Sequence, residues 1–299
     1  PIEGFNAINL INSAVIPNVW EYAQRYCGAK HNGFGWDFTG ASNTEELHQK
    51  LTQTVMLRRL KKDVLQDLPD KIHSFVPMEL ENKGTYTKAE ENLTEYITEQ
   101  KGREAAERAS NAEQLAKIEV LKQLAVEGKM KQSIEWIENY LDSNGKLVVF
   151  ATHKNVIDQL MEKFKEKAVK VDGRTSGVNR NAAVQTFQND ENVRLFVGNI
   201  QAAGVGLTLT AASTVVFLEL PWTPAALVQA EDRCHRIGQK DSVNVYYLLA
   251  QGTIEEEIAY MLDSKRKVLD KILDGKETEQ TSLLSEIIKK YQKKEKENA

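Results

Sequence analysis

The sequence predicts an α/β fold in which a doubly wound parallel sheet follows a mainly helical region. From residue 146 onward, unbroken runs of Val, Leu, Ile and Phe alternate with helical stretches, which is typical of strands buried on both faces of a parallel sheet. Between residues 86 and 141, Leu and Ile recur at helical spacing among Glu, Lys, Ala and Gln. The chain has 299 residues, which suggests two domains at about 100–200 residues each.

The composition excludes several classes of protein. Hydrophobic residues make up 41% of the chain, and 39 Lys and Arg against 43 Asp and Glu give a net charge of −4, which indicates a globular protein rather than a disordered one. An acidic balance argues against nucleic-acid binding through bulk positive charge, but leaves room for a few well-placed phosphate contacts. The apolar runs are far shorter than the ~18 residues of a membrane helix, and no secretion leader opens the chain. We therefore expect no membrane partner.

The two cysteines, Cys27 and Cys234, are too far apart in sequence for a local disulfide or a CxxC metal site. They favour a reducing compartment, with a structural disulfide as the alternative.

The first 75 residues are expected to be helical with one long loop. Pro17 ends the first helix, and Ser42 or Asn43 can cap the next one. The expected elements are a helix over 6–15, an ordered loop rich in Gly and aromatic residues over 25–43, and a helix over 44–59 that is closed off by Pro69. The chain begins without Met or a capping signal, so we expect a fragment of a longer protein.

The central and C-terminal elements follow from the change in apolar period. Two or three long amphipathic helices are expected over 86–141, with a break near Gly128. The strands are expected over 146–151, 168–171, 193–198, 214–220 and 243–250, and the helices between and after them over 155–167, 179–188, 224–236 and 254–273. A linker, a short helix and a frayed end are expected over 276–299.

Two loop segments carry residues that suit phosphate binding. Gly204 and Gly206 follow the third of these strands, where missing side chains let backbone amides approach a phosphate, although a tight βα turn is the alternative. Arg233 and Arg236 are three apart near the end of a helix, so their guanidiniums converge on one face. They repel each other unless an anion lies between them, such as nucleotide phosphates. Salt bridges to Glu231 and Asp232 are the structural alternative.

With these segments in view, the sequence resembles the Snf2 family of superfamily 2 DNA-dependent ATPases. The resemblance rests on GVGLTLTAA with PWTPAALVQAEDRCHRIGQ (motifs V and VI), on VDGRTSGVNRNAAVQTFQ, on VVFATHKNVIDQL (motif IV) and on TVMLRRLKKDVLQDLPDK, which is similar to the stretch between the two ATPase lobes. RYCGAKHNGFGWDFTGASN and MLRRLKKDVL look most like the HepA-related annealing-helicase branch. The resemblance implies a RecA-like sheet domain that follows a Snf2-specific helical region.

The resemblance also assigns roles in nucleotide binding. Arg236 would be the arginine finger on the γ-phosphate, and Arg233 would be its catalytic partner. Gln229 would be a polar contact near the nucleotide. The loop that couples nucleotide to DNA would be formed by Gly204, Val205, Gly206 and Thr208.

The resemblance assigns DNA contacts to the loops after the strands. These residues would be His153, Lys154, Thr175, Ser176, Gln201 and Trp222. The sequence departs from the family at two of these places. Thr223 replaces the Asn of the family's Trp-Asn-Pro, and Asn199-Ile200-Gln201 stands where many members have Ser-Thr-Lys or Ser-Thr-Arg.

No GxxxxGK[ST] phosphate loop occurs in the chain, and no DExH-type acid pair follows a strand. Those residues hold the phosphates and Mg²⁺ in P-loop ATPases. The expectation is therefore a C-terminal motor lobe that uses ATP and Mg²⁺ only in the full-length enzyme, together with an upstream RecA-like lobe and duplex or branched DNA. Alone, the fragment would bind no cofactor tightly and hydrolyse no ATP.

The resemblance divides the chain into four parts: the end of lobe one with the interlobe segment (1–75), a helical insertion (76–140), the RecA-like lobe (141–275) and a linker with a short helix (276–299). It also implies an intracellular protein, cytoplasmic if bacterial or phage and nuclear if eukaryotic.

Other functions remain as alternatives. The lobe could be a non-catalytic scaffold, and a sugar- or hydride-transferring enzyme is a weaker option because no dinucleotide fingerprint follows a strand. His235 suits a packing role better than that of a base. A metal site at Cys27 and His31, base stacking by Trp36 and Phe38, and DNA contact by the Lys-rich tail are each less favoured than a structural or solvated role.

Overall fold

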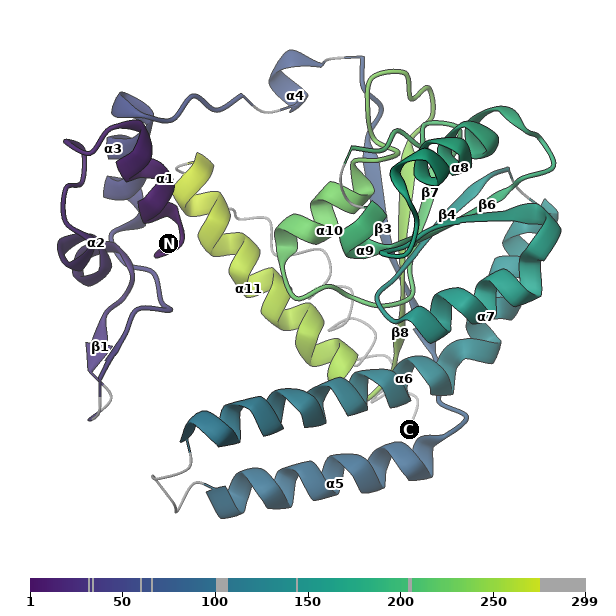
Figure 1. Ribbon diagram of the computed structural model, residues 1–299, viewed down its shortest axis with the longest axis horizontal. Coiled ribbons are helices and arrows are strands. Elements are labelled where there is room, and N and C mark those ends of the chain that lie inside the picture. The colour runs from purple at the N-terminus through teal and green to yellow at the C-terminus, as the bar shows by residue number, and fades with distance from the viewer. Residues whose placement is uncertain are drawn as a thin grey trace, which may run out of the picture. The chain divides into compact units, whose positions relative to one another are not determined.

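One parallel sheet organises the larger part of the chain (Figure 1). The computed structural model describes residues 1–31, 33, 35–59, 61–65, 67–100, 107–143, 145–203 and 206–274. The strands lie in the order β3-β8-β7-β4-β6-β5, and every neighbouring pair is parallel. Their bounds are β3 Lys71–Met78, β4 Leu147–Ala151, β5 Ala168–Val171, β6 Leu195–Asn199, β7 Thr214–Phe217 and β8 Val243–Ala250.

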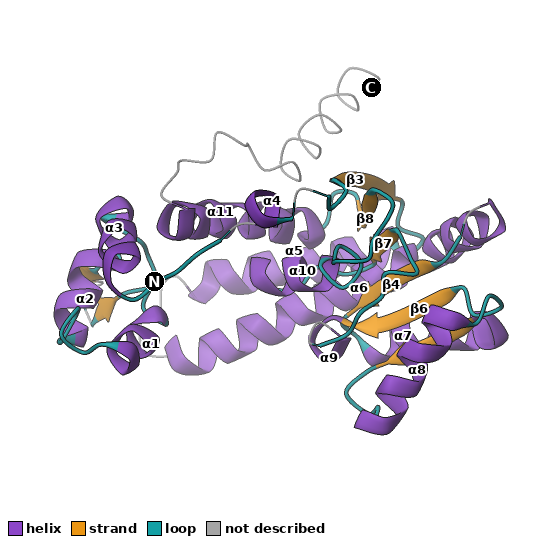
Figure 2. Cartoon of the chain, turned by 90° about the horizontal axis from the view of Figure 1, so that it is seen from above, coloured by secondary structure: helices purple, strands orange, loops and turns teal. Residues whose placement is uncertain are grey.

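The sheet is covered on both faces, which confirms the predicted doubly wound α/β architecture. All five residues of β4 are buried, and its Val149 pairs with Val197 of β6 on one side and Val216 of β7 on the other. One face packs against α6 Glu107–Ser143 and α7 Lys154–Phe164. The other face packs against α8 Gly177–Asn189, α10 Pro224–Glu231 and the first part of α11 Ile254–Asp274 (Figure 2). Short helices α9 Ile200–Ala203 and η2 Lys165–Lys167 complete this part.

The strand β3 is the element of the sheet that the sequence analysis missed. It occupies an edge of the sheet and pairs only with β8, from Lys71↔Val243 to Met78↔Ala250. An edge strand tolerates polar residues and proline because one side of its backbone needs no ladder partner, and β3 contains His73, Ser74 and Pro77. Its sequence therefore lacks the apolar run that identifies the central strands.

The long helical region is a pair of helices, α5 Lys83–Gln100 and α6, that pack against each other. The expected break near Gly128 is wrong, because α6 continues through that residue. A Cβ at Gly128 would lie 2.0 Å from Asn82 Oδ1, and the carbonyl of Gly128 accepts a hydrogen bond from the Glu81 amide at 2.9 Å. The glycine therefore serves close packing of the chain before α5 against α6, and not a turn.

Among the described residues, those up to 65 and those from 263 to 274 form a separate unit from those between 67 and 262. Its elements are α1 Gly4–Ile11, α2 Val19–Tyr26, β1 Lys30–His31, β2 Trp36–Asp37, α3 Thr44–Thr54 and α4 Lys61–Val64. Tyr22, Tyr26 and Leu47 form its core with Ile272 from the end of α11. The expected helix over 44–59 ends at Thr54, and the expected loop over 25–43 contains the β1–β2 hairpin.

Two of the predicted segments lie partly or wholly outside the described residues: the turn after the third predicted strand and the end of the chain. The expected turn after β6 begins as α9, and Gly204 and Val205 lie outside the described residues. The linker and short helix expected over 276–299 also lie outside them. None of the helices within the described ranges is both long and apolar enough to cross a membrane.

Candidate functional site

The two arginines of the candidate nucleotide site converge on one carbonyl group. Helix α10 is capped by Thr223, which accepts from the Ala226 amide at 3.4 Å, and it ends at Glu231, earlier than the predicted 236. Arg233 and Arg236 lie in the turns that follow. Arg236 Nη1 donates to the Leu207 carbonyl at 3.1 Å, and Arg233 Nη1 lies 3.4 Å from the same oxygen. The spacing of three residues thus brings the guanidiniums together, although through turns rather than a helix face.

The electrostatics of this pair favour an anion. Among the described residues neither guanidinium forms an ion pair with a carboxylate. Burial and then the neighbouring Arg236 lower the pKa of Arg233, and the opposing effect of Asp232 does not outweigh them. Two like charges held against one carbonyl are stabilised by a phosphate between them.

Salt bridges from the arginines to Glu231 and Asp232, the structural alternative, are not what the structure contains. Lys71 Nζ lies 2.9 Å from Glu231 Oε2 and 3.2 Å from Asp232 Oδ1. His73 Nε2 lies 3.2 Å from Glu231 Oε2, and the Tyr247 hydroxyl donates to Glu231 Oε1 at 2.9 Å. Burial alone would raise the pKa of Glu231, but the hydrogen bond from His73 and the charge of Lys71 lower it to about 2.

These contacts hold the turns that carry Arg233 and Arg236 against β3, at the edge of the sheet, and against its neighbour β8. Lys71 and His73 belong to β3 and Tyr247 to β8, so the buried carboxylate of Glu231 joins both strands to the end of α10. His235 is buried, and its Nε2 lies 2.6 Å from the Pro69 carbonyl oxygen, which fits the packing role expected for it. Lys71 and His73 are positioning residues that sequence reasoning missed, because β3 itself was missed.

The loop after α9 is hydrogen-bonded to the arginine turns. The Leu209 amide donates to the Arg233 carbonyl at 2.8 Å, and Gln239 Nε2 donates to the Ala212 carbonyl at 2.9 Å. Gly206 has a φ of +75°, a left-handed conformation that favours glycine. Thr208 is exposed, with its hydroxyl 3.4 Å from Arg236 Nη1.

Gln229, the remaining nucleotide candidate, is exposed on α10, and its carbonyl accepts from Arg233 Nε at 2.8 Å.

The arginine turns lie at the amino-terminal edge of the sheet. Lys71 is the first residue of β3, and Ala212 comes just before β7. Ligand sites of open parallel sheets usually follow the carboxyl ends of the strands, whereas Arg233 and Arg236 lie at the other edge. The six DNA candidates follow β4, β5, β6 and β7 at the opposite, carboxyl edge: His153, Lys154, Thr175, Ser176, Gln201 and Trp222. We call this second group the carboxyl rim.

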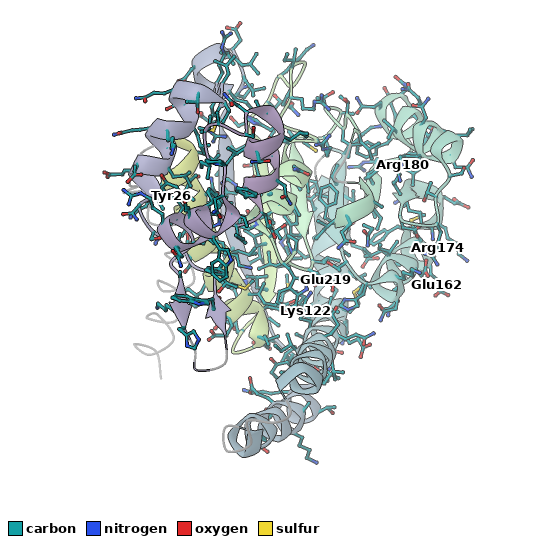
Figure 3. All side chains as sticks on the ribbon, turned by 60° about the vertical axis from the view of Figure 1, so that its left-hand side comes forward. Tyr26, Lys122, Glu162, Arg174, Arg180 and Glu219 are labelled. Atoms are coloured by element: carbon teal, nitrogen blue, oxygen red, sulfur yellow. The ribbon has the colours of Figure 1, made fainter. Side chains whose placement is uncertain are left out.

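Two hydroxyls of the carboxyl rim have partners within the protein. Thr175 Oγ1 accepts from the Asp172 amide at 3.0 Å, and Ser176 caps α8 by accepting from the Asn179 amide at 3.4 Å. Arg174, between β5 and α8, is held by Asp172 and by Asp158 Oδ1, the latter at 2.7 Å (Figure 3). Its charge is therefore balanced locally, whereas Lys154, the lysine that the sequence assigned to this edge, is exposed and forms no ion pair with the described residues.

Asn199 holds the end of β6 against the end of β4. Its Oδ1 accepts from the Gln201 amide at 3.1 Å, and its Nδ2 donates to the Thr152 carbonyl at 2.8 Å. The departure from the family at 199–201 thus places an amide where it caps α9, and leaves the Gln201 side chain exposed.

A buried carboxylate orients the start of α7. Glu219 Oε2 accepts from the Thr152 and His153 amides at 2.7 and 2.9 Å, and its Oε1 contacts His153 Nδ1. The hydrogen bond to Glu219 raises the pKa of His153. Glu219 lies 66 residues from His153, so no local sequence pattern could have paired them.

The remaining candidates have structural surroundings. Trp36 stacks on Phe38 with ring centroids 6.2 Å apart, and Trp20 packs edge-on to both rings. Cys27 is fully buried, and the residues that the structure describes contain no group of three or more metal-ligating side chains.

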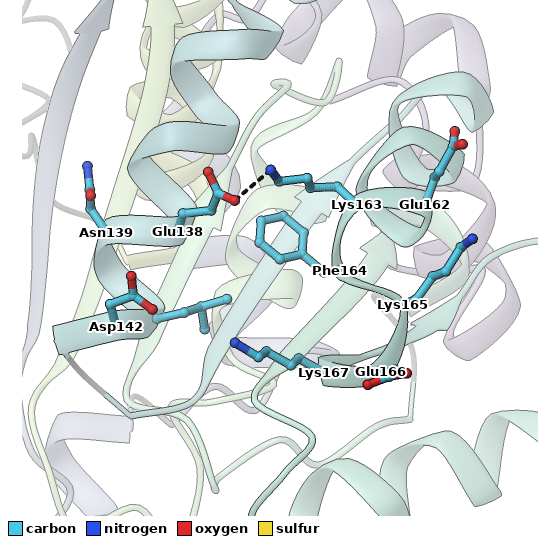
Figure 4. Close-up of a pocket in the computed structure, with 10 residues that line it drawn as sticks. Glu138, Asn139, Asp142, Glu162, Lys163, Phe164, Lys165, Glu166 and Lys167 are labelled. Atoms are coloured by element: carbon cyan, nitrogen blue, oxygen red, sulfur yellow. Dashed lines mark ion pairs between the residues drawn. The ribbon is translucent and has the colours of Figure 1, made fainter.

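A surface hollow between α6 and α7 lies near the amino-terminal edge of the sheet (Figure 4). Its lining mixes the carboxylates of Glu138, Asp142, Glu162 and Glu166 with Lys163, Lys165 and Lys167. Glu138 Oε1 pairs with Lys163 Nζ at 2.7 Å. This balance of charge favours no particular ligand.

Comparison with known protein families and structures identifies relatives of most of the chain. The model of the helicase conserved C-terminal domain matches residues 128–238. The chain is 37% identical over 273 residues to the Xenopus tropicalis SWI/SNF-related matrix-associated actin-dependent regulator of chromatin subfamily A-like protein 1, covering 90% of this chain and 28% of that protein. It is 38% identical over 265 residues to the human DNA annealing helicase and endonuclease ZRANB3, covering 86% of this chain and 24% of that protein. The chain thus spans about a quarter of the length of these two relatives.

Two solved structures are similar. The Sulfolobus solfataricus SWI2/SNF2 ATPase core in complex with dsDNA has a TM-score of 0.55 and 26% identity, covering 94% of this chain and 62% of that one. The C-terminal part of the Fun30 ATPase domain has a TM-score of 0.56 at 17% identity, covering 70% of this chain and 98% of that one, which is a likeness of fold alone.

Proposed function

Because the chain belongs to the Snf2 family and contains its C-terminal RecA-like lobe, we propose that it is one motor lobe of an ATP-dependent DNA translocase or remodelling helicase. ATP with Mg²⁺ would be hydrolysed between this lobe and an upstream RecA-like lobe. The observation that carries the proposal is the arginine pair, two guanidiniums without a carboxylate partner among the described residues.

The arginine pair fits the phosphate end of a nucleotide. Bound ATP would supply the phosphoryl group, and the residues for Mg²⁺ would come from the upstream lobe. Arg236 is exposed, and its partners among the described residues are the Leu207 carbonyl and the Thr208 hydroxyl, neutral acceptors that it can exchange for a charged one. Arg233 is anchored by the Gln229 carbonyl and adds a second positive charge. Charge that develops on the phosphoryl oxygens would be stabilised by both.

The loop between β6 and β7 links the two edges of the sheet. Near its start, Asn199 ties β6 to β4 at the carboxyl rim, and later along the loop Leu209 donates to the Arg233 carbonyl at the amino-terminal edge. These two attachments of the loop, one at each edge of the sheet, are the means by which a change at the nucleotide would reach the DNA contacts. DNA binding is supported by the similar SWI2/SNF2 core, whose structure is a complex with dsDNA.

The isolated 299-residue chain is expected to hydrolyse no ATP, because its sequence contains no phosphate loop. Phosphate release should be measured for the chain alone and for a protein that also carries the upstream lobe, each with saturating duplex DNA. Turnover should appear only in the longer protein. Turnover by the isolated chain that exceeds background, and that disappears in an Arg236→Ala preparation purified in the same way, would contradict the proposal.

DNA binding by this lobe is expected to be weak, independent of sequence and only shallowly salt-dependent, because the chain is acidic and few basic residues lie on the carboxyl rim. With two or three phosphate contacts, the slope of log K against log salt should be roughly −2 to −3, and Lys154→Ala should remove about 0.9 of it. Lys165→Ala is the matched control, an exposed lysine near the opposite edge of the sheet.

Labelled duplex titrated at several salt concentrations measures both quantities. A slope steeper than about −6 would indicate a basic surface elsewhere in the chain. An absence of binding at every salt concentration would favour the alternative function, a non-catalytic scaffold.

A further inference from the structure

Lys122 of α6 is a buried cation with no hydrogen bond to the described residues. Its side chain is 4% exposed, and its ammonium lies 4.6 Å above the centre of the Trp222 ring on the carboxyl rim. The nearest carboxylate is Glu119, whose Oε2 is 3.8 Å from Lys122 Nζ, too far for a hydrogen bond. Burying an ammonium without a hydrogen-bond acceptor lowers the stability of the folded protein, so a ligand that supplies an acceptor would relieve this penalty.

His153 presents a second buried donor to the same carboxylate. Its Nδ1 faces Glu219, while its Nε2 lies 2.9 Å from Glu119 Oε1. That contact is within ion-pair distance but outside hydrogen-bond geometry, so Nε2 is also a buried atom with no hydrogen-bond partner among the described residues. One glutamate thus stands between two cationic groups and gives neither a good hydrogen bond.

The two carboxylates around His153 differ in how firmly they are held. Glu219 is 1% exposed and is fixed by the amides of Thr152 and His153. The Glu119 side chain is 43% exposed and can rotate into solvent without movement of α6. Figure 3 shows Lys122 and Glu219 close together at this end of the sheet. Glu119 is therefore the anion that can leave.

The charges of Lys122, His153 and Glu219 add up to a site that can bind one singly charged anion in place of Glu119. The groups that face the imidazole of His153 are Glu219 from the segment after β7, and Glu119 and Lys122 from α6. With His153 protonated, the site carries one net positive charge once Glu119 has turned away. A phosphate diester carries one negative charge and two free oxygens, enough to accept from both Lys122 Nζ and His153 Nε2.

We propose that Lys122 and His153 form a binding site for a DNA backbone phosphate, and that Glu119 fills this site while no DNA is bound. The inference rests on the proposed DNA-binding function, and it adds Lys122 as a binding residue and Glu119 as a competitor. Trp222 then has a defined task, because the face of its ring lies against the Lys122 ammonium and holds it at the rim.

The test compares Glu119→Gln with Glu138→Gln in the full 299-residue chain. Both glutamates lie on α6, with side chains 43% and 40% exposed, and both face a basic partner, but Glu138 pairs with Lys163 near the opposite edge of the sheet (Figure 4). Affinity for a labelled duplex of arbitrary sequence should rise about three- to fivefold in Glu119→Gln, the scale of one partly exposed ion pair. It should not change in Glu138→Gln.

Two further readouts separate phosphate binding from a structural role. Lys122→Met should weaken binding and make the salt slope shallower by about 0.9, because one phosphate contact is lost. Binding by the unaltered chain should weaken as pH rises through the raised pKa of His153, since the site then loses its charge. In Glu119→Gln this pH midpoint should fall, because Glu119 helps to raise that pKa.

Equal affinities of Glu119→Gln and the unaltered chain would overturn the inference while leaving DNA binding intact, and weaker binding by Glu119→Gln would do the same. Failure of all four proteins to bind duplex would overturn the DNA-binding function and the inference together.

Discussion

Arg236→Ala should lower kcat of the two-lobed enzyme by something on the order of 10³-fold, with DNA affinity almost unchanged. The guanidinium lies beside Arg233, and its hydrogen-bond acceptors in the described part of the chain are neutral, so its charge is available to a phosphoryl group. DNA affinity should be spared because Arg236 is at the amino-terminal edge of the sheet, away from the carboxyl rim. Arg236→Lys should restore little activity, because an ammonium cannot reproduce the planar fork of donors.

Steady-state phosphate release and duplex titration on the same preparations measure these effects. Arg25→Ala is the control, because Arg25 is an exposed arginine whose charge is already paired with Glu46. A kcat for Arg236→Ala equal to that of the unaltered enzyme would mean that the arginine pair is structural.

Lys129→Met should destabilise the chain by about 3–5 kcal/mol, the usual cost of removing one partner from a buried ion pair. Lys129 is completely buried in α6, and its ammonium donates to Glu255 at 2.6 and 2.7 Å and to the Leu248 carbonyl at 2.6 Å. After the substitution, the hydrogen bond from the Ala250 amide to Oε2 is the one that remains for the buried carboxylate of Glu255 among the described residues. Burial already raises the pKa of Glu255, so the variant should regain stability as pH falls and this carboxyl takes up a proton.

Urea unfolding of the two proteins at several pH values measures the difference. Lys131→Met is the matched control on the same helix, because the Lys131 side chain is 68% exposed and pairs with Glu81, whose side chain is 62% exposed. It should leave the midpoint almost unchanged. A Lys129→Met midpoint equal to that of the control would show that the buried pair adds nothing to stability.

The sequence predicts those strands of the sheet that are buried, but not the strand at its edge next to β8. The strands β4 to β8 are runs of apolar residues and were all anticipated, whereas β3 mixes His73, Ser74 and Pro77 and was not. An edge strand is under weaker compositional constraint, so its pattern carries less information. The break expected at Gly128 was wrong for a different reason. Glycine marks a turn or a close approach equally well, and only the position of Asn82 decides between them.

In the candidate site, too, the sequence predicted the contacts between residues close in the chain and missed those between distant ones. Residue type and spacing predicted the convergence of Arg233 and Arg236, because their separation along the chain is short. The partners that matter are distant: Glu231 binds Lys71 from 160 residues away, and Glu219 binds His153 from 66 residues away. Local spacing suggested Glu231 and Asp232 as partners of the arginines. The sheet instead brings Lys71 and His73 to Glu231, through a strand pairing that has no local signature.

Because α6 continues through Gly128 without a break, the two ends of this helix are expected to move together as one rigid element. Its 37 residues span about 55 Å at 1.5 Å per residue, without a joint that could absorb bending. Glu119 and Lys122 sit on it near the rim, Lys129 grips Glu255 part-way along, and Glu138 lies near the far edge of the sheet. If α6 tilted by about 10° around Lys129, Glu119, which is about 15 Å away along the helix axis, would move by about 2.5 Å. That displacement is enough to withdraw Glu119 from the proposed phosphate site, so a movement of this helix would change the affinity of that site for DNA.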